Sequence, residues 1–176
     1  MQITVDRIKE LREMTSCGVI ECKKALEEAK GDFQKAKQIL QQRGLELAAK
    51  KGNRETKEGR VEAYIHAGSK IGVMVEVNCE TDFVAKNEAF EKFTKDVAMH
   101  IAAMNPKYIN RESVDADVLN QASDKEALIK EICLLQQPFI KDPKITIQDY
   151  INSLISSTGE NISIRRFSRY KVNEVE

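Results

Sequence analysis

The hydrophobic pattern changes its period once along the chain, and this change most constrains the fold. In the first fifty residues, apolar side chains recur three and four positions apart, as on one face of a helix. From residue 61 they alternate with polar ones, as on a strand with one buried face. Between the two parts lies the polar, glycine-flanked stretch 52–60, which we interpret as a linker. The sequence therefore predicts a helical module at 1–51 and a second domain at 61–176.

Three short helices are predicted in the first module. Thr4 is a candidate N-cap for the first helix, and residues 15–18 interrupt the pattern before a second helix. Gly31 is placed to end that second helix and Asp32 to cap the third. Such helices make a compact three-helix bundle of the UBA-like type, whose small core is typical of a binding module rather than a catalytic pocket.

The second domain is predicted to belong to the α+β class. Two alternating stretches form a β-hairpin with one apolar face, and a long helix capped by Asn87 carries an apolar stripe that should cover this face. An amphipathic helix begins after Thr146 and should end at Gly159. The stretch that follows has strand composition and can add a third antiparallel strand. The residues expected on the apolar face of the hairpin are Val61, Ala63, Ile65, Ala67, Ile71, Val73, Val75 and Val77.

The region between the long helix and Thr146 gives a weaker signal. A helix is predicted near residues 125–136, and Pro138 and Pro143 indicate an irregular segment after it.

Charge and cysteine content exclude several functional classes. The 28 basic and 28 acidic side chains cancel, which argues against non-specific binding to nucleic acid. The cysteines form no Cys-x-x-Cys pair and lie far in sequence from the two histidines, so we predict reduced, buried thiols and neither a metal site nor a cofactor. The cysteines are Cys17, Cys22, Cys79 and Cys133.

Neither a membrane span nor a targeting segment is predicted. No apolar run approaches the roughly 20 residues that cross a bilayer. The N-terminal stretch MQITVDRIKELRE has neither the apolar centre of a secretory signal nor the acid-free character of a transit peptide. We therefore expect the protein to act in the compartment where it is made.

Separated stretches of the chain carry recognisable motifs. They are LREMTSCGVIECKKALEEAKGDFQKA at 11–36, VMVEVNCETDFVAKNEAF at 73–90, QPFIKDPK at 137–144 and GENISIRRFSRY at 159–170. Together they resemble the elongation factor Ts family: its opening module, its most recognisable signature and its closing strand occur in the family's order. Because the matches run along nearly the whole chain, the resemblance is specific.

The chain departs from the family pattern in two places. The family usually has a turn of the type Thr-Gly-Ala-Gly-Met-Met, where this chain has Thr-Ser-Cys-Gly-Val-Ile at 15–20. The region at about 111–136 looks short beside longer relatives that carry two related core subdomains. This shortness leaves open whether the chain pairs with itself as a homodimer.

The resemblance implies a translation elongation factor that exchanges guanine nucleotides and performs no bond chemistry. Such a factor binds elongation factor Tu in its GDP-bound and nucleotide-free forms, displaces Mg²⁺ and GDP, and allows GTP to be reloaded. It also implies that four residues (the exchange segment) are pushed in beside the magnesium and nucleotide, and that three more (the docking residues) touch the GTPase. The exchange segment is Thr81, Asp82, Phe83 and Val84, and the docking residues are Arg12, Val19 and Ile20.

The residues themselves are compatible with these roles. Phe83 is a bulky apolar wedge on a short connection between a predicted strand and a predicted helix, and Asp82 can accept hydrogen bonds or repel phosphate oxygens. Spacing alone favours a Phe83 packed into its own core, and the family resemblance reverses that preference. Ile20 lies off the apolar face of its helix, whereas Val19 aligns with that face and is also a candidate core residue.

Two other classes of function remain open from the sequence. A UBA-like adaptor fused to a protein-interaction domain explains residues 1–50 but not the motifs at 73–90 and 159–170. Nucleic-acid binding rests on basic residues interleaved with aromatic ones near the C-terminus, although a charged edge strand explains them more simply. Those residues are Arg165, Arg166, Phe167, Arg169, Tyr170 and Lys171.

An enzyme is disfavoured, and the compartment is predicted only in part. Gly68 and Gly72 form no phosphate-binding pattern, and His66 is expected to face solvent or a partner. The closing stretch GENISIRRF resembles the version found in cyanobacteria and plastids. Bacterial cytoplasm and plastid stroma are the two expected locations.

Overall fold

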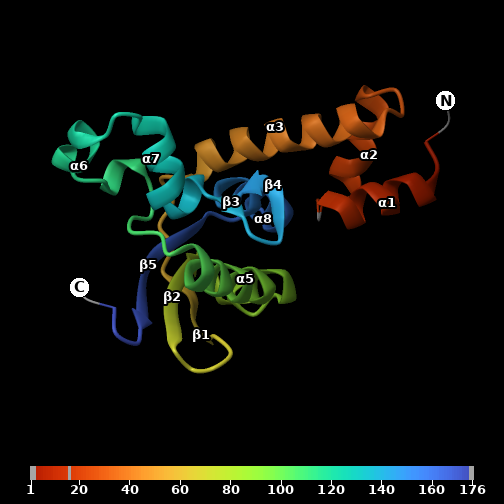
Figure 1. Ribbon diagram of the computed structural model, residues 1–176. Coiled ribbons are helices and arrows are strands. Elements are labelled where there is room, and N and C mark those ends of the chain that lie inside the picture. The colour runs from red at the N-terminus through yellow and green to blue at the C-terminus, as the bar shows by residue number, and fades with distance from the viewer. Residues whose placement is uncertain (1–2, 16, 175–176) are drawn as a thin grey trace.

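The computed structural model describes residues 3–15 and 17–174 and shows a helical arm beside an α+β core (Figure 1). The predicted fold class is confirmed. The helices are α1 (Val5–Thr15), α2 (Val19–Glu28), α3 (Phe33–Lys51), α4 (Asp82–Ala85), α5 (Glu88–Met104), α6 (Ala116–Gln121), α7 (Lys125–Ile132) and α8 (Ile147–Thr158). The strands are β1 (Glu58–Ile65), β2 (Ile71–Cys79), β3 (Pro138–Phe139), β4 (Asp142–Thr146) and β5 (Ile162–Lys171).

The arm consists of α1, α2 and α3, and local capping explains their ends. The Asp32 carboxylate accepts the backbone N–H groups of Gln34 and Lys35 at 2.9 and 3.1 Å, which satisfies donors that the helix leaves free. Gly31 ends the preceding turn with a φ of 84°, a conformation that glycine adopts without strain. Of the turn predicted at 15–18, Ser16 lies outside the described residues. The arm has its own core of Leu11, Cys17, Cys22, Ala25, Leu26, Ala29, Ala36 and Leu40.

The long helix α3 connects this arm to the rest of the molecule. Leu40 belongs to the core of the arm, whereas Leu47 and Ala48 pack against the main core. In Figure 1, α3 runs across the top of the core and over α8. The amide of Gln41 donates to the Asp149 carboxylate at 3.3 Å across this contact. The arm is therefore packed onto the core through α3 as well as joined to it by the chain.

The described part of the core contains an antiparallel sheet with the strand order β1-β2-β5, as predicted. Helix α5 covers one face of it, and its N-cap is Asn87, whose side chain accepts the N–H of Ala89 at 2.8 Å. Val73, Val75 and Val77 of β2 are buried beneath this helix. The side chains of α5 that bury them are Phe90, Phe93, Val97, Ala98, Ile101 and Ala102.

The predicted orientation of the first strand is wrong. Val61 and Ile65 of β1 lie on the outer face of the sheet and are 61% and 63% exposed. The register explains this, because Val61 pairs with Glu76 and Tyr64 pairs with Val73, and directly paired residues share a face. The polar side of β1 therefore meets α5.

Polar contacts replace apolar ones where β1 meets α5. Arg60 contacts Glu91 at 3.3 Å, and the Thr94 hydroxyl donates to Glu62 at 3.3 Å. The apolar alternation of β1 is left on the surface of the protein.

The region at 107–145 contains elements that the sequence did not reveal. A helix was predicted near 125–136, and α7 ends earlier, at Ile132. Together with α6 it forms a small separate core of Val114, Ile129 and Cys133. The stretch punctuated by prolines forms the β3–β4 hairpin, which packs against α8. Within the described residues, no helix is both long and apolar enough to cross a membrane.

A buried histidine joins α5 to the β3–β4 hairpin. His100 is fully buried; its Nδ1 accepts the N–H of Ile140 at 3.3 Å, and its Nε2 lies 2.9 Å from Oε1 of Gln137. Because Nδ1 is an acceptor, Nε2 carries the proton and donates to Gln137. Burial lowers the pKa of His100, and the bond to Gln137 offsets part of this change.

We predict that His100 makes stability depend on pH below neutrality. Its pKa is lowered in the folded state, so the unfolded chain binds more protons, and stability falls as pH drops below the unfolded value of about 6.5. The slope from this group is at most about 1.4 kcal/mol per pH unit. Urea unfolding between pH 5 and 8 measures it. His100→Gln should lose this part of the slope, and the exposed-site control His66→Gln should keep it; equal slopes for His100→Gln and the parent would contradict the prediction.

Candidate functional site

The exchange segment follows β2 directly and forms the short helix α4. The sequence predicted a short connection here, and the structure shows that it contains one helical turn, with Thr81 as its N-cap. Phe83 is 83% exposed, whereas Val84 beside it is only 8% exposed. Val84 holds the turn against the main core. The aromatic ring therefore projects from the surface on a turn that is fixed from below.

A carboxylate from a distant part of the chain holds the start of this turn. Oε2 of Glu160 accepts the backbone N–H groups of Glu80 and Thr81 at 3.1 and 3.0 Å. Oε1 of Glu160 accepts the Thr81 hydroxyl at 2.6 Å. Cys79 adds a further contact, since its thiol donates to the carbonyl of Thr81 at 3.1 Å. Burial raises the pKa of this thiol to about 11, and the nearby charge of Glu160 acts in the same direction, so the proton needed for this bond is retained.

Glu80 makes the reciprocal contact, to the segment that contains Glu160. Its Oε1 accepts the backbone N–H of Asn161 at 2.6 Å, and its Oε2 lies 3.4 Å from the guanidinium of Arg54. The bond from Asn161, followed by that from Arg54, lowers the pKa of Glu80. The residues at 80–81 and 160–161 are thus joined by bonds in both directions.

Asp82 presents its carboxylate to solvent beside a lysine. Nζ of Lys86 donates to Oδ2 of Asp82 at 2.8 Å, one helical turn further on. This hydrogen bond, and then the charge of Lys86, lower the pKa of Asp82. Asp82 is therefore ionised at neutral pH and keeps lone pairs with which it can accept hydrogen bonds from another molecule.

The docking residues lie on the outside of the arm. Val19 and Ile20 are 51% and 69% exposed, so Val19 is not the core residue that its alignment with the apolar face of α2 permitted. Arg12 and Val19 line a cleft of about 470 Å³ together with Asn87 and Ala89 at the start of α5. The structure thus brings these two docking residues next to the segment that follows the exchange segment, while Ile20 lies outside this cleft lining.

The basic strand near the C-terminus is β5, at the edge of the sheet. The Nε of Arg166 lies 2.7 Å from Glu76, and Arg169 lies 2.8 Å from Glu174 and donates to the carbonyl of Ala102 at 3.2 Å. A β-bulge opposite Glu76 and Val77 leaves Arg165 on the surface. These contacts favour the charged edge strand over a surface for nucleic acid, because two of its cations already have protein partners. His66 is exposed beside Tyr64, whose hydroxyl lies 3.1 Å from Nδ1.

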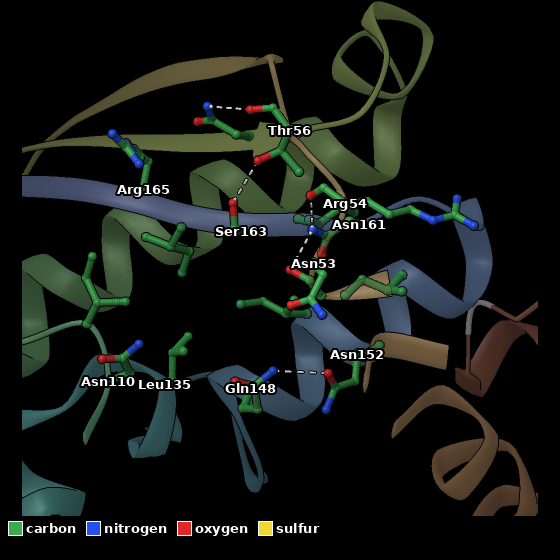
Figure 2. A pocket seen from close by; sticks show the side chains of 18 of the residues that line it. Asn53, Arg54, Thr56, Asn110, Leu135, Gln148, Asn152, Asn161, Ser163 and Arg165 are labelled. Carbon is green, nitrogen blue, oxygen red and sulfur yellow. Dashed lines mark hydrogen bonds between the residues drawn. The ribbon is translucent and has the colours of Figure 1, made fainter. Parts of the chain in front are cut away.

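A wide groove of about 1130 Å³ lies between α3, α8 and β5. Figure 2 shows that amide and hydroxyl side chains surround it, among them Asn110, Gln148, Asn152 and Ser163. Such groups can donate and accept hydrogen bonds and can therefore bind polar ligands. Among the described residues, no cluster of His, Cys, Asp and Glu side chains could hold a metal ion. The described cysteines are buried free thiols, as predicted.

Sequence reasoning missed the residues that hold the exchange segment. Glu80 and Glu160 lie within the quoted motifs at 73–90 and 159–170, yet the sequence assigned neither a role. A contact between residues 80 positions apart produces no periodic pattern in the sequence. The available signal was an acidic residue directly before Thr81 and another directly after Gly159, where each meets free backbone N–H groups.

Comparison with known proteins gives a consistent result along the chain. Residues 9–127 and 124–174 match the family model described as Elongation factor TS. Elongation factor Ts of Alkaliphilus oremlandii (strain OhILAs) is 50% identical over 197 residues, which cover 99% of this chain and 91% of that protein. Elongation factor Ts of Desulfotalea psychrophila (strain LSv54 / DSM 12343) is 49% identical over 195 residues, covering 98% and 99%.

The same comparisons locate a difference in length. The aligned stretch of 197 residues is longer than this chain of 176 residues, so the relative carries residues that this chain lacks. The two segments of the family match meet at 124–127, inside the region at 111–136 that the sequence indicated as short.

We predict that substitutions at two adjacent residues of the exchange segment differ strongly in their effect on stability. Phe83→Ala should change the free energy of unfolding by no more than about 0.5 kcal/mol, because the ring is exposed. Val84→Ala should cost about 1–3 kcal/mol, because it removes buried methyl groups. Urea unfolding of both variants checks this, and a large loss for Phe83→Ala would show that the ring packs inward.

Proposed function

Because this chain belongs to the elongation factor Ts family and is a translation elongation factor, we propose that it is a guanine-nucleotide exchange factor for elongation factor Tu. It binds the GDP-bound GTPase, displaces Mg²⁺ and GDP, and leaves a nucleotide-free complex that GTP can reload. The observation that carries this proposal is the exposed ring of Phe83 on a turn that the protein holds in place.

In the proposed reaction, α4 enters the GTPase beside its cation and nucleotide. Phe83 acts as an apolar wedge, and the ionised Asp82 accepts hydrogen bonds from the partner or repels phosphate oxygens. A rigid mounting matters, because a flexible turn would lose conformational entropy on insertion and offset part of the binding energy. The exposure of Phe83 and the hydrogen bonds made by Thr81 support this role.

The energies involved require more than one contact area. Nanomolar binding of a nucleotide corresponds to about 12 kcal/mol, and a thousandfold faster release needs a barrier lower by about 4 kcal/mol. Burial of one Phe side chain contributes roughly 1.5–3 kcal/mol. We therefore propose that Arg12, Val19 and Ile20 form a second contact with the GTPase, as their exposure allows.

The proposed mechanism is reciprocal coupling between two ligands of one GTPase. A factor that weakens the binding of nucleotide is itself bound less tightly when nucleotide is present. No covalent bond is made or broken, so the protein is an exchange factor rather than an enzyme in the usual sense, and it uses no cofactor. Its place of action is the bacterial cytoplasm or the plastid stroma, where the GTPase is found.

We predict that Phe83→Ala slows the release of GDP. The rate of release from elongation factor Tu carrying fluorescent GDP, at saturating factor, should fall roughly 10- to 100-fold, which corresponds to the loss of one buried aromatic side chain. Stopped-flow fluorescence measures this rate with and without the factor.

Met104→Ala provides a matched control for this experiment. Met104 is another exposed apolar side chain, at the far end of α5, about 24 Å from its first residue by helical rise. With the Met104→Ala variant, GDP should be released from elongation factor Tu at the same rate as with the parent. A Phe83→Ala variant as fast as the parent would contradict the role of the exchange segment. If the protein were an adaptor of the UBA-like type, neither the parent nor any variant would change the rate of GDP release.

We also propose that the outer face of the sheet binds a second copy of this chain. Each strand of this face carries at least one exposed apolar side chain, and such an exposed patch marks an interaction site. Glu76 and Arg166 lie side by side on it, so it carries both charges and is self-complementary under a twofold rotation. Its exposed apolar residues are Val61, Ala63, Ile65, Met74 and Tyr170.

We predict that Met74→Lys prevents this pairing. Met74 is 54% exposed at the centre of the face, between Ala63 and Ser168, and two lysines brought together there would repel each other. Sedimentation equilibrium at micromolar concentration should show a dimer for the parent and a monomer for the variant. Lys70→Met, at the adjacent hairpin turn, serves as a control that leaves the centre of the face unchanged. A monomeric parent would reject the pairing.

A further inference from the structure

The contacts around the exchange segment extend to the end of α3, and from them we propose that Glu160 is a positioning residue for nucleotide exchange. This inference rests on the proposed function. Glu160 touches neither nucleotide nor cation; it acts through Thr81 and α4 on Phe83. Together with Glu80 and Asn161, it joins the exchange segment to the base of the helical arm.

The short helix α4 depends on the contacts at its N-terminal end. A helix of four residues has no independent stability, because forming the first turn fixes several dihedral angles for a single hydrogen bond. Its N-terminal donors must also be satisfied. The Thr81 hydroxyl accepts only the long 3.5 Å contact from Val84, and the Thr81 carbonyl accepts the N–H of Ala85 at 3.2 Å. Glu160 accepts three donors from residues 80 and 81, directly before the helix. The Glu160 carboxylate is therefore the main anchor at this end.

Asn161 connects this anchor to the helical arm. Asn161 follows Glu160 and is only 7% exposed; its backbone N–H binds Glu80, and its side-chain amide donates to the carbonyls of Gly52 and Arg54 at 3.4 and 2.8 Å. Figure 2 shows the amide of Asn161 beside Arg54 and Asn53. The carbonyl of Gly52 lies directly after α3. The end of the arm is thus fixed to the same turn that holds Thr81.

The contacts of Glu160 and Asn161 affect where Phe83 lies relative to the docking residues. Phe83 lies two residues after Thr81, so a shift of Thr81 changes where the ring projects. The docking residues lie on the arm, and their distance from the ring has to match the surface of the GTPase. Glu160 and Asn161 hold Thr81 and the end of α3, and in this way keep the two contact areas at a fixed separation. This matters because displacement of a reacting group by about 1 Å can cost orders of magnitude in rate.

The chemistry of the anchor suggests a pair of variants. Glu160→Ala removes the acceptor for all three donors. Glu160→Gln keeps one oxygen for the two N–H groups and offers an amide donor to the Thr81 hydroxyl, which can reverse its bond. If position is what matters, the glutamine variant retains function; if the negative charge itself acted on the GTPase, it would not.

The test measures the release of GDP as a function of factor concentration. Glu160→Ala should lower the maximal rate about tenfold and change the half-saturating concentration less than about threefold, because the docking residues are untouched. Glu160→Gln should stay within about twofold of the parent. In the Phe83→Ala background, Glu160→Ala should cause no further loss, since two residues that act through one contact are not additive.

Controls separate this inference from a loss of folding and from the proposed function. Glu126 lies on α7, and Glu126→Ala breaks its surface contact to Arg111; this variant should leave the release of GDP unchanged. In the free parent protein, the amide hydrogens of residues 80 and 81 should be protected from exchange with solvent, whether or not Glu160→Ala folds. Unprotected amides, a parental rate for Glu160→Ala, or a full further loss in the Phe83→Ala background would overturn the positioning role. A parent that does not release GDP would overturn the proposed function itself.

Discussion

Burial of one face of β2 beneath α5 is the contact on which the rest of the structure depends. Val73, Val75 and Val77 are closed off by the aromatic and aliphatic side of α5, and each such side chain contributes roughly 1.5–3 kcal/mol when it is fully buried. The exchange segment is the short connection between these two elements. Its entry and exit are therefore fixed by the deepest part of the core, although its own aromatic ring faces outward.

Much of the fold was predictable because its signals are local. Asn87, Thr146 and Gly159 mark the ends of α5 and α8 through bonds to their immediate neighbours. The outward face of β1 was mispredicted for a physical reason: alternation shows which residues share a face, whereas the register with β2 decides which face is buried. The β3–β4 hairpin also depends on partners outside its own stretch.

The candidate site shows the same division between local and distant information. Phe83 was found by resemblance, and its exposure could not be derived from spacing, which favours an inward ring. Glu80 and Glu160 were missed because each carboxylate accepts backbone N–H groups from a segment that is distant in the sequence. The role of a residue that bonds to its immediate neighbours can be predicted from a single sequence. The role of a residue that bonds to the backbone of a distant segment cannot.

The segment that contains α6 and α7 has a small core of its own, and backbone bonds from Leu134 and Leu135 to the carbonyls of Tyr108 and Ile109 hold its two ends together. A segment that buries apolar side chains in a core of its own depends little on packing against the sheet. During evolution it can therefore gain or lose residues while the sheet, the long helix and the exposed ring keep their places. Variation in length among homologues would then be confined to the periphery of the fold, and the segments proposed to contact the GTPase would be unaffected.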